Sequence, residues 1–194
     1  MNARVRLSYL LTLCFLFSAL SAVFAQSSKK AVKKNKIKSV SVTRTVIKDG
    51  NELTRKESFD KYDDHGNNIE SIEYDDNGEV KKHESNVYNK NNDKTENIDY
   101  LPDGKLKKKK VVKYDAGNKK MEEQHYDGSG NLVDKEMYSY NSNNERISEL
   151  RFDKNNNVIQ KVTILYDKKG MSVEKRTYDA KDNLESTRKI VYEY

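Results

Sequence analysis

Residues 62–67 of this chain read Tyr-Asp-Asp-His-Gly-Asn, and residues 126–131 read Tyr-Asp-Gly-Ser-Gly-Asn. Both stretches begin at members of a series of aromatic residues spaced alternately by 12 and 14 positions: Tyr62, Tyr74, Tyr88, Tyr100, Tyr114, Tyr126, Tyr140, Phe152, Tyr166, Tyr178 and Tyr192. A fixed period of 26 residues indicates one supersecondary unit copied in tandem, each copy burying its apolar side chains against its neighbours. The repeat predicts the architecture more directly than the activity.

The residues after each aromatic predict a turn. The next residue is Asp or Asn in nine of ten cases, and the exception, Leu101, precedes the only proline. Four positions after each aromatic stands a residue that tolerates positive φ: Gly66, Gly78, Asn92, Gly104, Asn118, Gly130, Asn144, Asn156, Gly170 and Asp182. This chemistry predicts ten four-residue hairpin loops, each built around a type I turn.

Segments of eight and ten residues remain between the loops, such as 67–74 and 79–88. The longer segments carry apolar residues near the start and usually two positions before the aromatic, and both positions share one strand face with it. If the loops have four residues, apolar residues of the shorter segments fall on that same face: Ile69, Met121, Ile147 and Val173. The sequence thus predicts an all-β fold, an antiparallel meander of about twelve strands in a twisted or curled open sheet with one thin apolar face.

The first strand is expected at 37–47, where Val40, Val42 and Val46 alternate with serine and threonine. A shortened turn at 48–51 leads to the next strand, near 53–62. This first copy departs from the repeat, as terminal repeats often do.

The first 25 residues predict a secretory signal peptide that is cut after Ala25. Arg4 and Arg6 precede an apolar run, which ends in Val23-Phe24-Ala25. A transmembrane anchor is the competing interpretation, but serine and threonine interrupt the run. Cys14 lies inside it, so a chain that begins at Gln26 has no cysteine and therefore no disulfide, thiolate metal site or cysteine nucleophile. The expected location is the periplasm or the medium.

Charge divides the rest of the chain into two parts. Residues 26–36 form a basic leader, expected to be flexible and solvated, whereas residues 37–194 form a single β-repeat domain with mixed and nearly balanced charge. The basic pI of about 9.1 therefore comes from the N-terminal part. This distribution does not indicate a nucleic-acid-binding surface.

The Tyr-Asp-x-x-Gly-Asn core of residues 62–67 and 126–131 resembles the YD repeats of Rhs-type cell-surface and toxin-shell proteins. The resemblance covers residues 59–194 and implies a large curling β-sheet. The family often encloses a C-terminal toxin in such a shell. This chain is far shorter than those proteins, and it is more similar to small secreted bacterial proteins of unknown function built only from such repeats, so the toxin role is not carried over.

No residue set predicts catalysis, a cofactor or a metal site. His65, His83 and His125 lack metal-ligand spacing and are expected to be solvated. Loop acids such as Asp63 and Asp75 are explained by turn formation without calcium. The run at 107–110 is expected to keep an exposed sheet surface soluble rather than to bind anions.

The tyrosines leave two interpretations open. Each ring can simply pack over the neighbouring strand with its hydroxyl in water. Alternatively, the tyrosines that end the longer strands form a ligand ladder suited to a glycan or an extended peptide: Tyr88, Tyr114, Tyr140, Tyr166 and Tyr192.

The sequence favours a secreted or periplasmic, non-enzymatic protein with no membrane span after signal cleavage. Its expected role is a binding or interaction scaffold for a glycan or protein of the cell envelope. The alternative is a structural element that assembles through its edge strands, with copies of itself or with a partner. An enzyme with a site built from scattered Asp, Glu and Tyr is the third and least favoured hypothesis.

Overall fold

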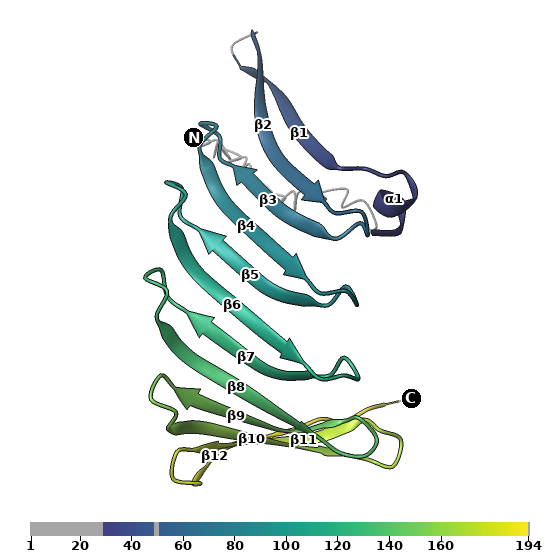
Figure 1. Cartoon of the computed structure of the whole chain (residues 1–194), viewed down its shortest axis with the longest axis vertical. Coiled ribbons are helices and arrows are strands. Elements are labelled where there is room, and N and C mark those ends of the chain that lie inside the picture. The colour runs from purple at the N-terminus through teal and green to yellow at the C-terminus, as the bar shows by residue number, and fades with distance from the viewer. Residues whose placement is uncertain (1–28, 49–50, 194) are drawn as a thin grey trace, which may run out of the picture.

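The computed structural model describes residues 29–48 and 51–193. The described residues form one short helix, α1 (Lys29–Lys34), and twelve strands: β1 (Ser39–Lys48), β2 (Asn51–Tyr62), β3 (Asn68–Tyr74), β4 (Val80–Tyr88), β5 (Lys94–Tyr100), β6 (Leu106–Tyr114), β7 (Lys120–Tyr126), β8 (Leu132–Tyr140), β9 (Arg146–Asp153), β10 (Val158–Tyr166), β11 (Ser172–Asp179) and β12 (Leu184–Lys189). All twelve strands belong to one antiparallel sheet in sequential order (Figure 1). The predicted all-β meander is confirmed, and the sheet stays open, with β1 and β12 at its edges.

The ten loops that follow the aromatic residues share one geometry. In the first, the amide of Gly66 donates to the carbonyl of Asp63 and the amide of Asp63 donates to the carbonyl of Asn67, both at 3.0 Å. The Asp63 carboxylate also accepts from the amides of His65 and Asn67, at 2.9 and 2.8 Å. All ten residues expected at positive φ have it, between 60° and 82°. The predicted turn chemistry is confirmed.

The predicted loop length is wrong. The bond between Asp63 and Asn67 closes a loop of three residues, a type I turn followed by a left-handed residue. The ladder then pairs Tyr62 with Asn68 and Lys61 with Glu70, so Ile69 is an extra residue in a bulge. An equivalent register shift follows every later loop.

The bulges leave residues of the expected apolar face without strand partners. Met121 and Ile147, which were expected on it, each occupy the bulge position and are 38% exposed. A bulge leaves its extra residue out of the ladder, so these side chains lack the directly opposite neighbour against which a paired residue packs. The residue types of the turns do not predict the bulge that follows each of them.

The two faces of the sheet differ in burial. Face A carries Tyr138, Val162 and Ile164, which are 4%, 6% and 9% exposed. Face B carries Met137 and Leu165, which are 43% and 49% exposed. In Figure 1, β3–β8 turn their broad side to the viewer while β9–β12 are seen nearly edge-on, so the sheet bends between these groups. The burial difference indicates that it bends toward face A, where the predicted thin apolar core lies.

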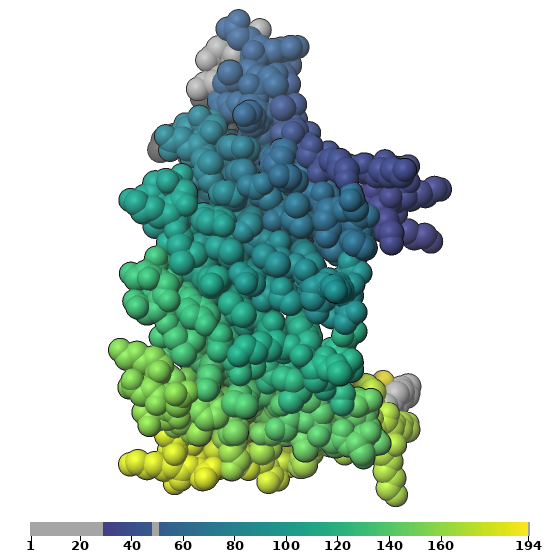
Figure 2. Space-filling view, in the orientation of Figure 1, coloured from purple at the N-terminus to yellow at the C-terminus, as the bar shows by residue number. Residues whose placement is uncertain are grey.

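The basic segment that was expected to be a flexible leader contains the helix α1. Val32 is fully buried, and the carbonyl of Val32 accepts from the amide of Ile37 at 3.0 Å. The helix lies against the first loop, and it projects from one side of the elongated molecule (Figure 2). The predicted signal peptide and its cut after Ala25 fall outside the described residues.

Gly66 is the loop residue that this helix constrains most. Its φ is +77°, and a Cβ there would lie 2.7 Å from the carbonyl oxygen of Lys29. Gly130 has φ +80° with nothing within 4 Å of such a Cβ. We expect Gly130→Ala to cost about 1 kcal/mol for the left-handed conformation, and Gly66→Ala to cost about 2 kcal/mol because the helix must also move. Urea denaturation of the two variants measures the difference, and equal losses would mean that α1 does not rest on this loop.

Candidate functional site

The tyrosines of the predicted ligand ladder share a hydrogen bond. Each hydroxyl donates to the backbone carbonyl of the residue 20 positions earlier, which is the first residue of the neighbouring strand. The pairs are Tyr88 with Asn68 (3.1 Å), Tyr114 with Lys94 (3.0 Å), Tyr140 with Lys120 (2.8 Å), Tyr166 with Arg146 (2.9 Å) and Tyr192 with Ser172 (3.0 Å). The expectation of hydroxyls in water is wrong for these five residues, which we call the hydroxyl row.

The acceptor carbonyls of the hydroxyl row belong to the bulged segments that follow the loops. A bulge breaks the ladder locally and leaves backbone groups without strand partners. The tyrosine hydroxyl supplies a donor at that point in each repeat. Burial raises the pKa of Tyr88 and Tyr114 above the ordinary value, which keeps these phenols protonated.

The aromatic residues that end the shorter strands lie on face B, and each faces a basic side chain. Lys109 lies 5.0 Å from the ring centre of Tyr126, Lys135 lies 5.1 Å from that of Phe152, and Lys161 lies 5.3 Å from that of Tyr178. His83 stacks on Tyr100 with ring centres 4.6 Å apart, and Lys56 lies 5.8 Å from the ring centre of Tyr74. We call these five pairs the cation–aromatic row.

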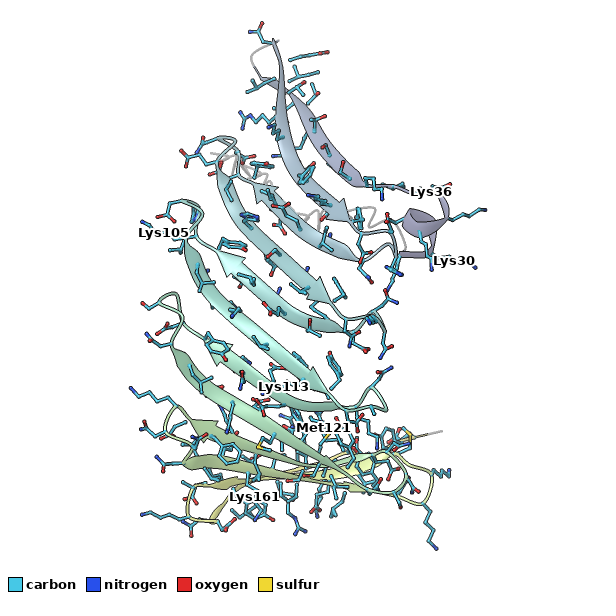
Figure 3. All side chains as sticks on the ribbon, viewed as in Figure 1. Lys30, Lys36, Lys105, Lys113, Met121 and Lys161 are labelled. Atoms are coloured by element: carbon cyan, nitrogen blue, oxygen red, sulfur yellow. The ribbon has the colours of Figure 1, made fainter. Side chains whose placement is uncertain are left out.

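Strand register sets the spacing of this row. His83, Lys109, Lys135 and Lys161 recur every 26 residues and pair directly with their aromatic partners on the next strand. Equivalent pairs therefore lie two strands apart, or roughly 10 Å at ordinary strand spacing. Lys135 and Lys161 also donate to loop oxygens of Asn156 and Asp182, both at 2.7 Å. Figure 3 shows Lys161 on β10, in the bent part of the sheet.

A row of carboxylates accompanies the cations on face B. Glu70, Glu96, Glu122 and Glu174 recur at the same period, with Ser148 replacing the carboxylate once. Glu70, Glu96 and Glu122 each lie two residues before the strand position that pairs with His83, Lys109 or Lys135. His83 and Glu70 are in contact at 3.0 Å. Face B thus presents positive and negative side chains in two neighbouring lines.

Face A holds a charged cluster around two buried carboxylates, which we define as Lys110, Lys120, Glu123, His125, Asp134 and Arg151. His125 lies between two carboxylates, with Nε2 2.7 Å from Glu123 and Nδ1 2.6 Å from Asp134. Arg151 binds the other oxygen of Asp134 at 2.7 Å. The prediction of a solvated His125 is therefore wrong.

Glu123 is the most heavily coordinated carboxylate of the charged cluster. It accepts from Lys110 at 2.7 Å, from Lys120 and from His125, and its side chain is 7% exposed. Burial opposes its ionisation, but these hydrogen bonds outweigh burial and lower the pKa of Glu123 to about 2. For Asp134, burial is likewise outweighed by hydrogen bonds from Arg151 and His125, and the pKa lies below the ordinary value.

Tyr138 packs beside the charged cluster between two cations. Its ring centre lies 4.8 Å from the Lys120 ammonium and 5.1 Å from the Arg146 guanidinium. Its hydroxyl donates to Glu136 at 2.5 Å, and burial followed by this bond raises the pKa of Tyr138. The two buried carboxylates of the charged cluster are bonded to the basic side chains of the same cluster.

The basic run at 107–110 divides between the faces of β6. Lys108 and Lys110 bind Asp99 and Glu123 on face A, while Lys109 covers Tyr126 on face B. Two of these lysines thus have specific partners that the run alone did not reveal. The described residues contain no group of three His, Cys, Asp or Glu side chains placed to hold a metal ion.

Sequence reasoning missed the charged cluster and the cation–aromatic row. The row had a visible signal, because basic residues recur every 26 positions at 83, 109, 135 and 161. The cluster had a weaker one, which is the concentration of charged residues at face A positions of strands in the middle of the sheet.

Comparisons with known proteins identify no family. No family model matches the chain, and no curated protein matches it. A porin-like protein from Bacteroides uniformis ATCC 8492 is similar in structure, with a TM-score of 0.44 and 12% identity over 72% of this chain and 70% of that one. The crystal structures of TcdB2-TccC3-Cdc42 and TcdB2-TccC3 align with TM-scores of 0.25 and 0.22 at 10% and 8% identity, over 74% and 76% of this chain but 11% and 13% of theirs.

Among the described residues, no helix has the length and apolar character needed to cross a bilayer. The molecule is an all-β repeat protein.

Proposed function

We propose that this protein is a non-enzymatic binding scaffold of the cell envelope, which holds an extended glycan or protein chain along face B. The observation that carries the proposal is the cation–aromatic row, in which one pair of side chains is presented at every second strand. A ligand with its own repeat can meet several such pairs at once. Weak contacts then combine through high effective concentration.

The composition of face B favours ligands with polar groups of both charges. The cation–aromatic row offers ammonium groups. The neighbouring carboxylates of Glu70, Glu122 and Glu174 pair with His83, Lys113 and Arg176 and, with two oxygens each, can accept further hydrogen bonds. The carboxylates of face B would repel a purely anionic polymer. An amino-sugar glycan or a peptide of mixed charge satisfies both lines.

The predicted ladder of Tyr88, Tyr114, Tyr140, Tyr166 and Tyr192 takes a smaller part in this proposal. Their hydroxyls are already bonded within the sheet, which leaves ring surface alone for a ligand. The assignment of the repeats to the YD type is likewise part of the proposal. It is supported by the Asp-capped turns and the left-handed glycines that follow the tyrosines.

Export is required for a role in the envelope. We propose that the chain is cleaved after Ala25 and acts in the periplasm or outside the cell. N-terminal sequencing of material from the periplasm and the medium tests this. A first residue of Gln26 is expected, and recovery of an intact Met1 in the membrane pellet would contradict it.

Two lysines of the row provide the test of binding. We expect the double change Lys109→Ala and Lys135→Ala to weaken binding to an array of amino-sugar glycans and mixed-charge peptides by about tenfold, or about 1.4 kcal/mol, because it removes two neighbouring ammonium groups that the ligand would contact. Lys154→Ala with Lys168→Ala is the matched control, because it removes the same charge from exposed loops. Equal losses in both variants would show that only net charge matters. No binding to any array member by the unchanged protein would refute the scaffold.

A further inference from the structure

Both edges of the sheet are open within the described part of the chain. The strands pair in sequential order, so β1 pairs with β2 alone and β12 pairs with β11 alone. Every residue of β12 is exposed. The outer edge of such a strand carries unpaired amide and carbonyl groups, which can pair with another strand.

The edge formed by β1 has few of the features that prevent pairing. It is ten residues long, contains no proline, and carries Arg44 as its one charge between Ser39 and Ile47. Ile47 is 76% exposed. Natural edge strands are usually short, or are interrupted by proline or several charges. A long, β-branched edge of this kind favours a strand partner.

The phase of the repeat identifies that partner. Strands whose C-terminal aromatic residue belongs to the hydroxyl row alternate with strands whose C-terminal aromatic residue belongs to the cation–aromatic row. β12 leads to Tyr192, and the bonds from Ile190 to Val173 and from Tyr192 to Ser172 continue its pairing beyond Lys189. β1 precedes β2, which leads to Tyr62, so β1 occupies the place of a strand of the other type. A copy of β1 placed against β12 would continue the alternation.

Direction and sidedness agree with this placement. The sheet has twelve antiparallel strands, so β1 and β12 of two copies in the same orientation run antiparallel. Val40 and Val42 pair with Asp60 and Ser58, which share the face of Tyr62, and this is face A. Arg188 pairs with Lys175 on face A, so Ile190, two positions later, lies on face A as well. The apolar residues of the two edges would meet on one face.

We propose that copies of this chain associate head to tail, with β12 of one copy pairing with β1 of the next in a continuous antiparallel sheet. The two surfaces in contact differ, so the association repeats and forms rows, or rings where the bend of the sheet closes them. This contact is separate from ligand binding on face B, and either can fail without the other.

The pairing pattern shows which amides point outward. The carbonyl of Lys38 accepts from the amide of Tyr62, so the backbone polar groups of Lys38, Val40 and Val42 point toward β2. Those of Ser41, between Val40 and Val42, point away from β2. The amide of Ile190 donates to Val173, so the amide of Thr187 also faces away from β11. Ser41→Pro and Thr187→Pro therefore remove one outward donor each and leave the internal ladder in place. Ser41→Ala and Thr187→Ala are the controls.

Sedimentation velocity over a range of concentrations is the test. We expect the unchanged protein and both alanine variants to form larger species as concentration rises, and each proline variant alone to remain a monomer. An equimolar mixture of the proline variants should form dimers and nothing larger, because one supplies a free β12 and the other a free β1.

Three results would overturn the proposal. One is an unchanged protein that stays monomeric at every concentration. Another is a Thr187→Pro variant that associates as the unchanged protein does, which would indicate pairing of β1 with β1. The third is a mixture that yields no dimer. If a proline variant loses its melting transition, Val40→Lys and Ile190→Lys replace the pair, because each puts a charge on the apolar line at one edge.

Discussion

Replacing Glu123 with Gln is expected to lower the free energy of unfolding at pH 7 by about 3 kcal/mol. The carboxylate is buried and accepts from Lys110, Lys120 and His125, so its loss leaves three donors around a neutral amide. Removing one partner of a buried ion pair typically costs about 3–5 kcal/mol, and we take the lower end because the cations are partly exposed. Urea denaturation followed by circular dichroism measures the change.

Glu122 provides the matched control. It is the preceding residue, but it lies on face B, and its ion pair with Lys113 involves a side chain that is 59% exposed. Exposed pairs contribute about 0–1 kcal/mol, so Glu122→Gln should change stability by less than 1 kcal/mol. If the two variants lose the same amount, the charged cluster of face A does not stabilise the fold.

The same residue predicts a pH dependence. The folded pKa of Glu123 is about 2 against an ordinary value of 4.5, so the unfolded chain takes up the proton first as the pH falls. Its stabilisation is therefore fully present above about pH 4.5 and is lost as the pH falls toward 2, with a magnitude of roughly 2–3 kcal/mol. The free energy of unfolding of Glu123→Gln should therefore fall less than that of the unchanged protein between about pH 4.5 and pH 2. An unchanged acid profile in the variant would contradict the assignment.

Changing Tyr114 and Tyr140 together to Phe is expected to cost about 2 kcal/mol. Both hydroxyls donate to carbonyls of bulged strand segments, at 3.0 and 2.8 Å. An unpaired polar group that is cut off from water costs about 1–3 kcal/mol, and these carbonyls are only partly cut off, so about 1 kcal/mol per site is expected. Thermal denaturation in the same buffer measures the loss.

Tyr74→Phe with Tyr178→Phe is the control for the hydroxyl row. These residues belong to the cation–aromatic row, where the chain itself has Phe at position 152. The ring and its cation remain after the change, and the Tyr178 hydroxyl loses only its hydrogen bond with the partly exposed Arg176 side chain, so the loss should stay below about 1 kcal/mol. Equal losses in the two double variants would show that the repeated hydroxyl bond has no particular role. Since the rings are kept throughout, a ligand that stacks on them should still bind to both.

The repeat and its turns could be predicted because they depend on local chemistry. Positive φ at Gly66 and Asn92, and Asp63 as the acceptor of loop amides, follow from residue type and spacing alone. The bulge at Ile69 could not be predicted, because nothing in its residue type separates an extra strand residue from a paired one. This one residue per hairpin leaves Met121 and Ile147 out of the ladder and partly exposed.

The candidate site was harder to predict than the fold. Tyrosine at a strand end is compatible with a free hydroxyl or a bonded one, and the choice depends on a carbonyl 20 residues away. His125 looks isolated in the sequence, yet register places it between Glu123 and Asp134. Such contacts depend on strand pairing to the exact residue, which the pattern of aromatics does not supply.

The hydroxyl row has a mechanical consequence. Each of its bonds joins a strand to its immediate predecessor, and no strand of the described chain pairs with a distant one. A pulling force applied across the strands, between β1 and β12, would therefore separate the strand pairs one after another. Repeats that interact only with neighbours open in steps. The force trace should show a series of similar, small peaks rather than a single rupture, each releasing the length of one repeat or half-repeat.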